Sequence, residues 1–211
     1  MDTKGREQQI KLIIKLEERI GWCRRCPALI KCTGRPSLGK GDLEPEVLLV
    51  FECECDQTLD IKWVIELRNT IRKYFGVDRI YHTFMVRCHP KSCVSKQGNN
   101  FCLTGKLLNQ NSICLLSDQL CDGIPIKPSS EEIINCMYYL MEEIAILRPQ
   151  YTILFGSRVE DFVLKSFGIF DSDTNQQVHK FETTTLLTTV ENKLYRAEDI
   201  KRLAEIANIT Y

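Results

Sequence analysis

Two cysteines that could share one metal centre lie early in the chain, in the stretch Cys23-Arg-Arg-Cys26. A C-x2-C pair supplies two thiolate ligands, so a complete site needs further ligands from later in the chain. The best candidates are Cys88, which lies between Val-Arg and His-Pro, and Cys136, which ends Glu-Glu-Ile-Ile-Asn-Cys. Four such thiolates suit either a [4Fe-4S] cluster or a tetrahedral zinc site. Spacing alone leaves both metals open.

The compartment expected for the protein decides how its other cysteines are interpreted. The first residues lack an apolar signal core, and no run approaches the roughly 18 apolar residues that a membrane span needs. We therefore expect a soluble, cytoplasmic protein with no membrane partner. In that compartment the 11 cysteines of the chain should be metal ligands or small buried residues, because the cytosol keeps thiols reduced.

The charge of the chain is balanced, with 28 Lys and Arg against 28 Asp and Glu. The net charge therefore gives no indication of a nucleic-acid partner. Any contact with DNA phosphates must come from a local group, such as the basic residues around the first cysteine pair, which are Arg24, Arg25, Lys31 and Arg35. A solvated basic surface explains the same residues equally well.

The elements that must position these residues alternate between helix and strand. Helical spacing of apolar residues or capping signals predict helices over residues 8–20, 61–75, from about 129 to 147, 157–167 and 196–209. Apolar or alternating runs predict strands over residues 47–51, 79–87, 151–156 and 183–190. This alternation indicates an α/β fold, a three-layer α/β/α arrangement around a central, mostly parallel four-stranded sheet. One domain over residues 1–211 is sufficient.

Periodicity is lost over residues 91–127, which hold four cysteines and the polar run Gln97-Gly98-Asn99-Asn100. A segment this long without regular structure is uncommon inside a compact domain. We interpret it as a Cys-rich insertion, and it is the candidate contact for a protein partner.

A set of motifs in fixed order resembles the uracil-DNA glycosylase superfamily, and within it the iron-sulfur branch called family 4. The resemblance covers about residues 8–209 apart from the insertion. The motifs that carry it are Cys23-x2-Cys26-Pro27, a strand followed by Glu52, Arg87-Cys88-His89-Pro90, Pro128-x2-Glu131-Glu132-Ile133-x2-Cys136, and Leu147-Arg148-Pro149 before a strand that ends in Gly156. The resemblance implies that Cys23, Cys26, Cys88 and Cys136 hold a [4Fe-4S] cluster.

The resemblance also places Glu52 at the family's catalytic acidic position, but the motifs around it depart from the family. Phe51-Glu52-Cys53-Glu54-Cys55 lacks the glycines and proline of the family's loop. Phe84 stands where the family has an Asn that reads uracil, and a Phe ring cannot hydrogen-bond to an amide edge. The family's late His-Pro-Ser aligns near residues 187–191, which contain no His.

These departures predict an iron-sulfur, uracil-DNA glycosylase-like protein that binds DNA in repair or replication and has weak or absent uracil excision. Two alternatives stay open. One is an active DNA glycosylase of base excision repair that uses Glu52 against uracil or another damaged base. The other is a zinc-stabilised protein-interaction module whose residues 91–127 contact a partner.

Overall fold

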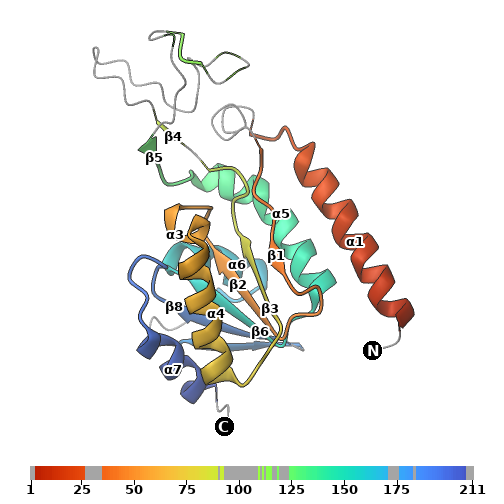
Figure 1. Cartoon of the computed structure of the whole chain (residues 1–211), viewed down its shortest axis with the longest axis vertical. Helices are drawn as coiled ribbons and strands as arrows, with labels where there is room; N and C mark the ends of the chain where they lie inside the picture. Colours follow the sequence, from red (N-terminus) through yellow and green to blue (C-terminus); the bar gives the residue numbers. More distant parts are fainter. Residues whose placement is uncertain are drawn as a thin grey trace.

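The computed structural model describes residues 3–26, 35–89, 91–92, 109, 111, 113–115, 118, 124–170, 176–182 and 184–207. Its helices are α1 (Thr3–Gly21), α3 (Asp56–Leu59), α4 (Ile61–Phe75), α5 (Ser130–Leu147), α6 (Ser157–Ser166) and α7 (Ala197–Ile206). Figure 1 shows these helices arranged around one central sheet. Helices and strands alternate along the chain, as the sequence predicts.

The central sheet has six strands in the order β1-β3-β2-β6-β8-β7. Its four inner strands are parallel to one another and are the four that the sequence predicts, namely β2 (Val47–Phe51), β3 (Ile80–Phe84), β6 (Tyr151–Phe155) and β8 (Thr184–Thr189). The prediction of a four-stranded sheet is wrong, because an antiparallel strand is added at each edge. These strands are β1 (Lys40–Gly41), which pairs with β3, and β7 (Val178–Phe181), which pairs with β8.

Helices cover both faces of the sheet, and the alternation of strand residues divides the core between them. Leu48 and Val50 of β2 pack with apolar residues of α1, α5 and α6. Val47, Leu49 and Phe51 point to the other face and pack with α4 and α7. The continuous burial of β2 follows from this double cover. The three layers agree with the predicted α/β/α arrangement.

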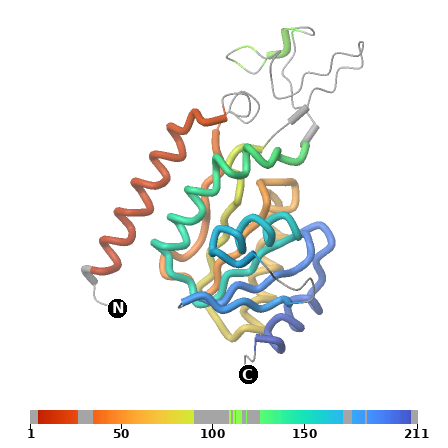
Figure 2. The backbone as a smooth tube through the Cα atoms, turned by 180° about the vertical axis from the view of Figure 1, so that it is seen from behind, coloured from red at the N-terminus to blue at the C-terminus, as the bar shows by residue number. Residues whose placement is uncertain are grey.

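Helix α1 lies on the outside of α5, as Figures 1 and 2 show from opposite sides. Ile13, Leu16 and Ile20 form the buried stripe of α1. The Gln9 side-chain amide also donates to the Ile146 carbonyl oxygen over 3.0 Å. This packing directs the segment after α1, with Cys23 and Cys26, toward the N-terminal half of α5.

The two ends of the predicted insertion are paired with each other. β4 (Lys91–Ser92) and β5 (Ile124–Pro125) form a separate two-stranded antiparallel sheet. Most of the chain between them lies outside the described residues. The partner contact predicted for residues 91–127 therefore falls mostly on residues outside the described part of the chain. Among the helices that the structure describes, none is both long and apolar enough to cross a membrane.

Candidate active site and candidate metal centre

A pocket opens at the carboxyl ends of the parallel strands. From β2 the chain continues to β3 on one side, whereas from β6 it continues to β8 on the other. The edge between β2 and β6 is therefore the switch point at which α/β proteins commonly bind ligands. The pocket has a volume of about 130 Å³ and is lined by Glu52, Cys53, Cys55, His89, Ile126, Lys127, Phe155, Gly156, Arg158, Val159, Glu191, Asn192 and Lys193.

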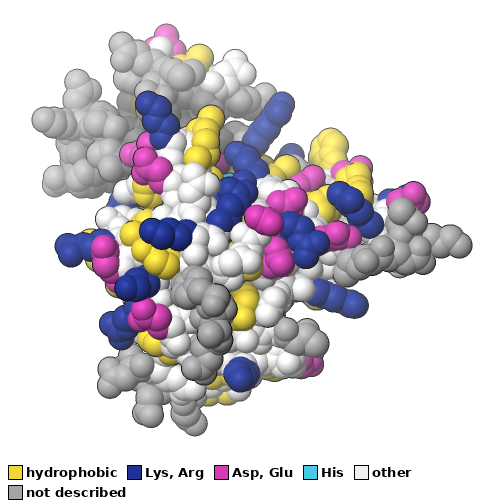
Figure 3. Space-filling view, turned by 60° about the horizontal axis from the view of Figure 1, so that its bottom comes forward, with side chains coloured by type: hydrophobic (Ala, Val, Ile, Leu, Met, Phe, Trp, Pro, Cys, Tyr) yellow, Lys and Arg dark blue, Asp and Glu magenta, His cyan; other side chains and the backbone are white. Residues whose placement is uncertain are grey.

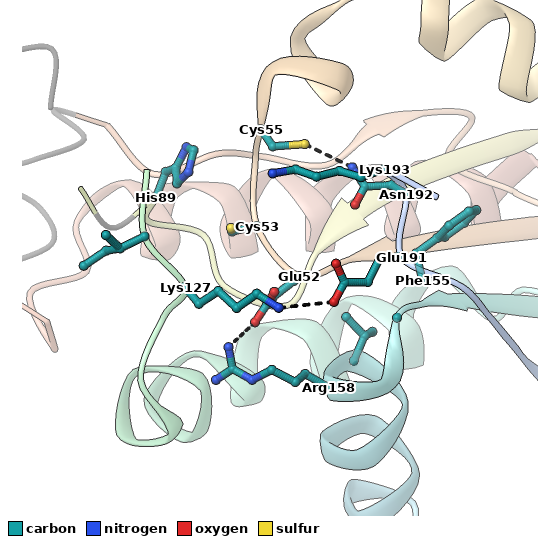
Figure 4. A pocket seen from close by; sticks show the side chains of 13 residues that line it. Glu52, Cys53, Cys55, His89, Lys127, Phe155, Arg158, Glu191, Asn192 and Lys193 are labelled. Atoms are coloured by element: carbon teal, nitrogen blue, oxygen red, sulfur yellow. Dashed lines mark hydrogen bonds and ion pairs between the residues drawn. The ribbon is translucent and has the colours of Figure 1, made fainter. Parts of the chain in front are cut away.

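The predicted catalytic residue Glu52 lies in this pocket, directly after β2, and is paired with Arg158 from the first turn of α6 (Figure 4). Arg158 also donates to the Pro128 carbonyl oxygen over 2.7 Å. Burial raises the pKa of Glu52, while the charges of Arg158 and Lys127 oppose that rise. The carboxylate is thus held by a cation that is itself fixed by the backbone.

A second ion pair lies in the pocket beside the first. Lys127 Nζ lies 3.2 Å from Glu191 Oε1, which joins the segment after β5 to the segment after β8. Gly156 directly follows β6 with a φ of +97°, and a Cβ at this position would lie 2.9 Å from Glu191 Cγ. The glycine is therefore required for the close approach of the two strand ends.

The upper wall of the pocket carries sulfur and amide groups. Asn192 Nδ2 donates to Cys55 Sγ over 3.1 Å, and Cys53 lies between that pair and Glu52 (Figure 4). Burial, followed by the nearby Glu52, raises the pKa of Cys53 to about 12, so this residue is a neutral thiol at physiological pH. His89 lines the pocket from the side of the cysteine-rich stretch.

Phe84, from the family comparison, and the histidine of β7, His179, lie away from the pocket. Phe84, at the position of the family's Asn, is 1% exposed and packs in the core on the α4 side. Its ring centroid is 6.3 Å from that of Phe51, which stacks in turn 4.7 Å from Phe155. His179 is buried in β7, with Nε2 3.1 Å from the Gln176 carbonyl oxygen. Neither residue lines the pocket.

Sequence reasoning missed Arg158, Lys127, Asn192 and His89 as pocket residues. The available signal was position, because ligand-facing residues of an α/β sheet directly follow the carboxyl ends of strands. Asn192 satisfies that rule after β8, and Arg158 satisfies it after β6. Lys127 could not be found this way, since it reaches the pocket from the end of the insertion.

The four predicted ligand cysteines line a second, smaller cavity. Cys23 and Cys26 follow α1, Cys88 follows β3, and Cys136 lies in the second turn of α5. The backbone N–H of Arg87 donates to Cys136 Sγ over 3.2 Å. Within the described residues, no three His, Cys, Asp or Glu side chains are placed to hold a single metal ion.

The surroundings of the cavity order the cysteine-bearing segments. Arg25 donates to the Asn135 carbonyl oxygen over 3.1 Å and lies over the rings of Tyr138 and Tyr139, with its Cζ 5.4 Å and 5.5 Å from the ring centroids. Arg24 donates to the Cys23 carbonyl oxygen. Of the basic group that the sequence offers for phosphate, Arg25 is thus used within the protein, whereas Lys31 lies outside the described residues.

Four thiols around one cavity are a donor set that would suit a thiolate-bound metal centre, either an iron-sulfur cluster or zinc. Burial raises the pKa values of Cys26 and Cys136. A cationic metal centre reverses this preference, because coordination deprotonates a thiol. The residues that would hold a cluster are Cys23, Cys26, Cys88 and Cys136. Such a group, when bound, supplies a rigid cross-link between the α1 end, the β3 end and α5.

The parallel sheet, its helices on both faces and the pocket at its switch point define an α/β protein with a polar pocket at the position where such folds commonly bind ligands. A scan against protein-family models matches residues 42–202 to the uracil DNA glycosylase superfamily. The chain therefore belongs to the uracil DNA glycosylase superfamily. A comparison with curated proteins gave no significant match.

Proposed function

We propose that this chain is a DNA-binding iron-sulfur protein of the superfamily, related to family 4, that works in DNA repair or replication with weak or absent uracil excision. The proposal rests on how the pocket carboxylate is paired and on where the base-reading position lies. Its carboxylate, Glu52, is engaged by Arg158. Base excision needs a flipped base to be held by its edge and the departing charge to be stabilised. The Phe84 ring, at the base-reading position, lies in the core instead.

The contact with DNA is proposed for the turn after β8. Lys193 is exposed and lines the pocket, and Leu194 beside it is 67% exposed. A lysine can meet a phosphate, and an apolar side chain can enter between base steps. On the face shown in Figure 3, basic and acidic side chains are interspersed. A local contact of this kind is therefore what a chain of balanced charge can offer.

Two variants test this contact. Lys193→Ala and Leu194→Ala should each weaken DNA retention several-fold in a salt-controlled filter-binding assay, and only the lysine variant should reduce the salt dependence. The matched control is Lys165→Ala, which removes an exposed lysine near the C-terminal end of α6, outside the turn after β8. Equal retention by all three variants would contradict the assigned contact.

The proposal of a [4Fe-4S] cluster rests on the four cysteines that line one cavity. In a cluster each cysteine binds a separate iron, so the sulfurs need not stand at the spacing around a single ion. Cys136→Ala should lose iron and solubility together, whereas Cys55→Ala, in the other pocket, should keep both. A zinc-containing, colourless wild type would favour the zinc-stabilised module instead.

A second candidate function is an active glycosylase with an altered base preference. His89 and Asn192 line the pocket together with Glu52, so an imidazole, an amide and a carboxylate surround one volume. This combination can hydrogen-bond to a base edge and assist a leaving group.

Excision assays separate the two candidates. Protein purified without oxygen is incubated with single- and double-stranded oligonucleotides that contain uracil, and abasic sites are cleaved with alkali. We expect no product from brown, DNA-retaining protein. Product that is lost in Glu52→Gln and kept in Glu54→Gln would establish an active enzyme and overturn the non-excising function.

A further inference from the structure

An ion pair that the proposed activity does not use is buried beside the cysteine cavity. Arg87 and Glu143 each have 2% of their side-chain surface exposed, and Arg87 Nη2 donates to Glu143. Glu143 also accepts from the Tyr81 hydroxyl over 3.0 Å and from Thr83 Oγ1 over 2.5 Å. The carboxylate is therefore fully engaged by three donors from β3 and the segment after it.

The guanidinium, in contrast, is only partly satisfied. Arg87 Nε and Nη1 are buried and have no hydrogen-bond partner in the described part of the chain. A guanidinium carries five N–H donors, and leaving them unpaired away from water is strongly unfavourable. Because the Nε and Nη1 groups of Arg87 are buried without a partner, a bound ligand that offers hydrogen-bond acceptors would stabilise them.

Arg87 lines the neighbouring cysteine cavity, so a group bound there would lie next to this residue. Cys23, Cys26, Cys88 and Cys136 line it with Arg87, whose backbone N–H already donates to Cys136 Sγ. A cluster held by four thiolates is anionic, because the thiolate charge exceeds that of its core, and its sulfurs accept hydrogen bonds. A buried cation next to it stabilises the group and, above all, its more negative reduced form.

We propose that Arg87 is a positioning residue for the metal centre, whose unpaired N–H groups donate to the sulfurs of the bound cluster while Glu143 anchors the guanidinium. This inference rests on the cluster of the proposed function. Arg87 thereby sets how firmly the cluster is held and at what potential it accepts an electron.

Potentials of charge variants test the inference. Arg87→Gln removes a positive charge and should lower the one-electron midpoint potential, measured by spectroelectrochemistry with an electrode as the electron source, and speed iron loss to a chelator several-fold. Glu143→Gln removes a negative charge and should raise the potential. Arg87→Lys, which keeps the charge and loses donors, should keep the potential near wild type and still lose iron faster. Arg72→Gln, exposed on α4, is the matched charge control.

The results distinguish two kinds of failure. Brown wild type with the same potential and iron retention in every variant, or shifts of one sign in Arg87→Gln and Glu143→Gln, overturns the role of Arg87 and leaves the cluster standing. A wild type without iron overturns both. If Arg87→Gln does not fold, Arg87→Lys and Glu143→Gln decide by the same criteria.

Discussion

His82 on β3 is held as a neutral imidazole inside the sheet edge. Arg68 Nη2 lies 3.0 Å from His82 Nδ1, and since a guanidinium can only donate, Nδ1 is the acceptor. Burial, followed by the charges of Arg68 and Lys40, lowers the pKa of His82 to about 4. In mild acid, His82 therefore binds a proton in the unfolded chain but stays neutral in the folded protein.

The stability of the protein should consequently fall in mild acid. Between pH 6.5 and 4 the unfolded imidazole is protonated and the folded one is not, so the free energy of unfolding drops as pH falls through this window, by up to about 3 kcal/mol. His82→Gln should flatten this part of the profile. Urea unfolding at intervals from pH 4 to 7.5 is the measurement, and an equally steep loss in His82→Gln would refute it.

Gly156 is a position where the backbone, rather than a side chain, limits substitution. Its φ of +97° and the short distance from an added Cβ to Glu191 Cγ predict that Gly156→Ala lowers the free energy of unfolding by about 1–3 kcal/mol. Gly5→Ala is the control, since nothing lies within 4 Å of its added Cβ. Chemical denaturation of both variants checks this, and an unchanged midpoint for Gly156→Ala would contradict it.

At the scale of elements, the start of α5 determines where Cys136 lies. The Ser129 hydroxyl accepts from the Glu132 backbone N–H, and the Glu132 carboxylate accepts from the Ser129 backbone N–H. Ser129→Ala should reduce stability by about 1 kcal/mol. Ser130→Ala, one residue into the helix, should change it by far less. Thermal unfolding followed by circular dichroism tests the difference, and equal midpoints for the two variants would refute the cap.

Elements with a strong local signal could be predicted from the sequence. Helix α4 spans the predicted residues, because its apolar stripe is regular and Gly76 ends it in the left-handed conformation, with a φ of 64°. The two-residue strand β1 is too short to show any period, and it forms only because β3 offers it an edge. Pairing with a distant partner is not encoded in local spacing.

The candidate sites divide in the same way. Glu52 and the four cysteines could be chosen from motifs, and the structure places the cysteines around one cavity. The partner of Glu52 could not be chosen, because Arg158 is brought to it by the packing of α6 on the sheet. The buried pair of Arg87 and Glu143 likewise joins β3 to α5 across the chain.

At the scale of the whole molecule, the two ends of the insertion are joined to each other. β4 and β5 hold its two ends side by side. Replacing residues 93–123 by a short Gly/Ser linker should leave the fold intact and move the melting temperature by only a few degrees, because the free energy of loop closure changes slowly with loop length. Circular dichroism and iron content of this variant, compared with the full chain, are the measurements. A variant that is insoluble or loses its iron would show that the segment is part of the core structure.

The antiparallel strands at the two edges of the sheet have a further consequence for how copies of the protein behave in concentrated solution. An unpaired edge strand is a template on which another chain can add a strand and start aggregation. Here each edge presents an exposed lysine, Lys40 on β1 and Lys180 on β7. To pair edge to edge, two molecules would have to bury or oppose these charges. The short flanking strands therefore protect the parallel sheet against self-association.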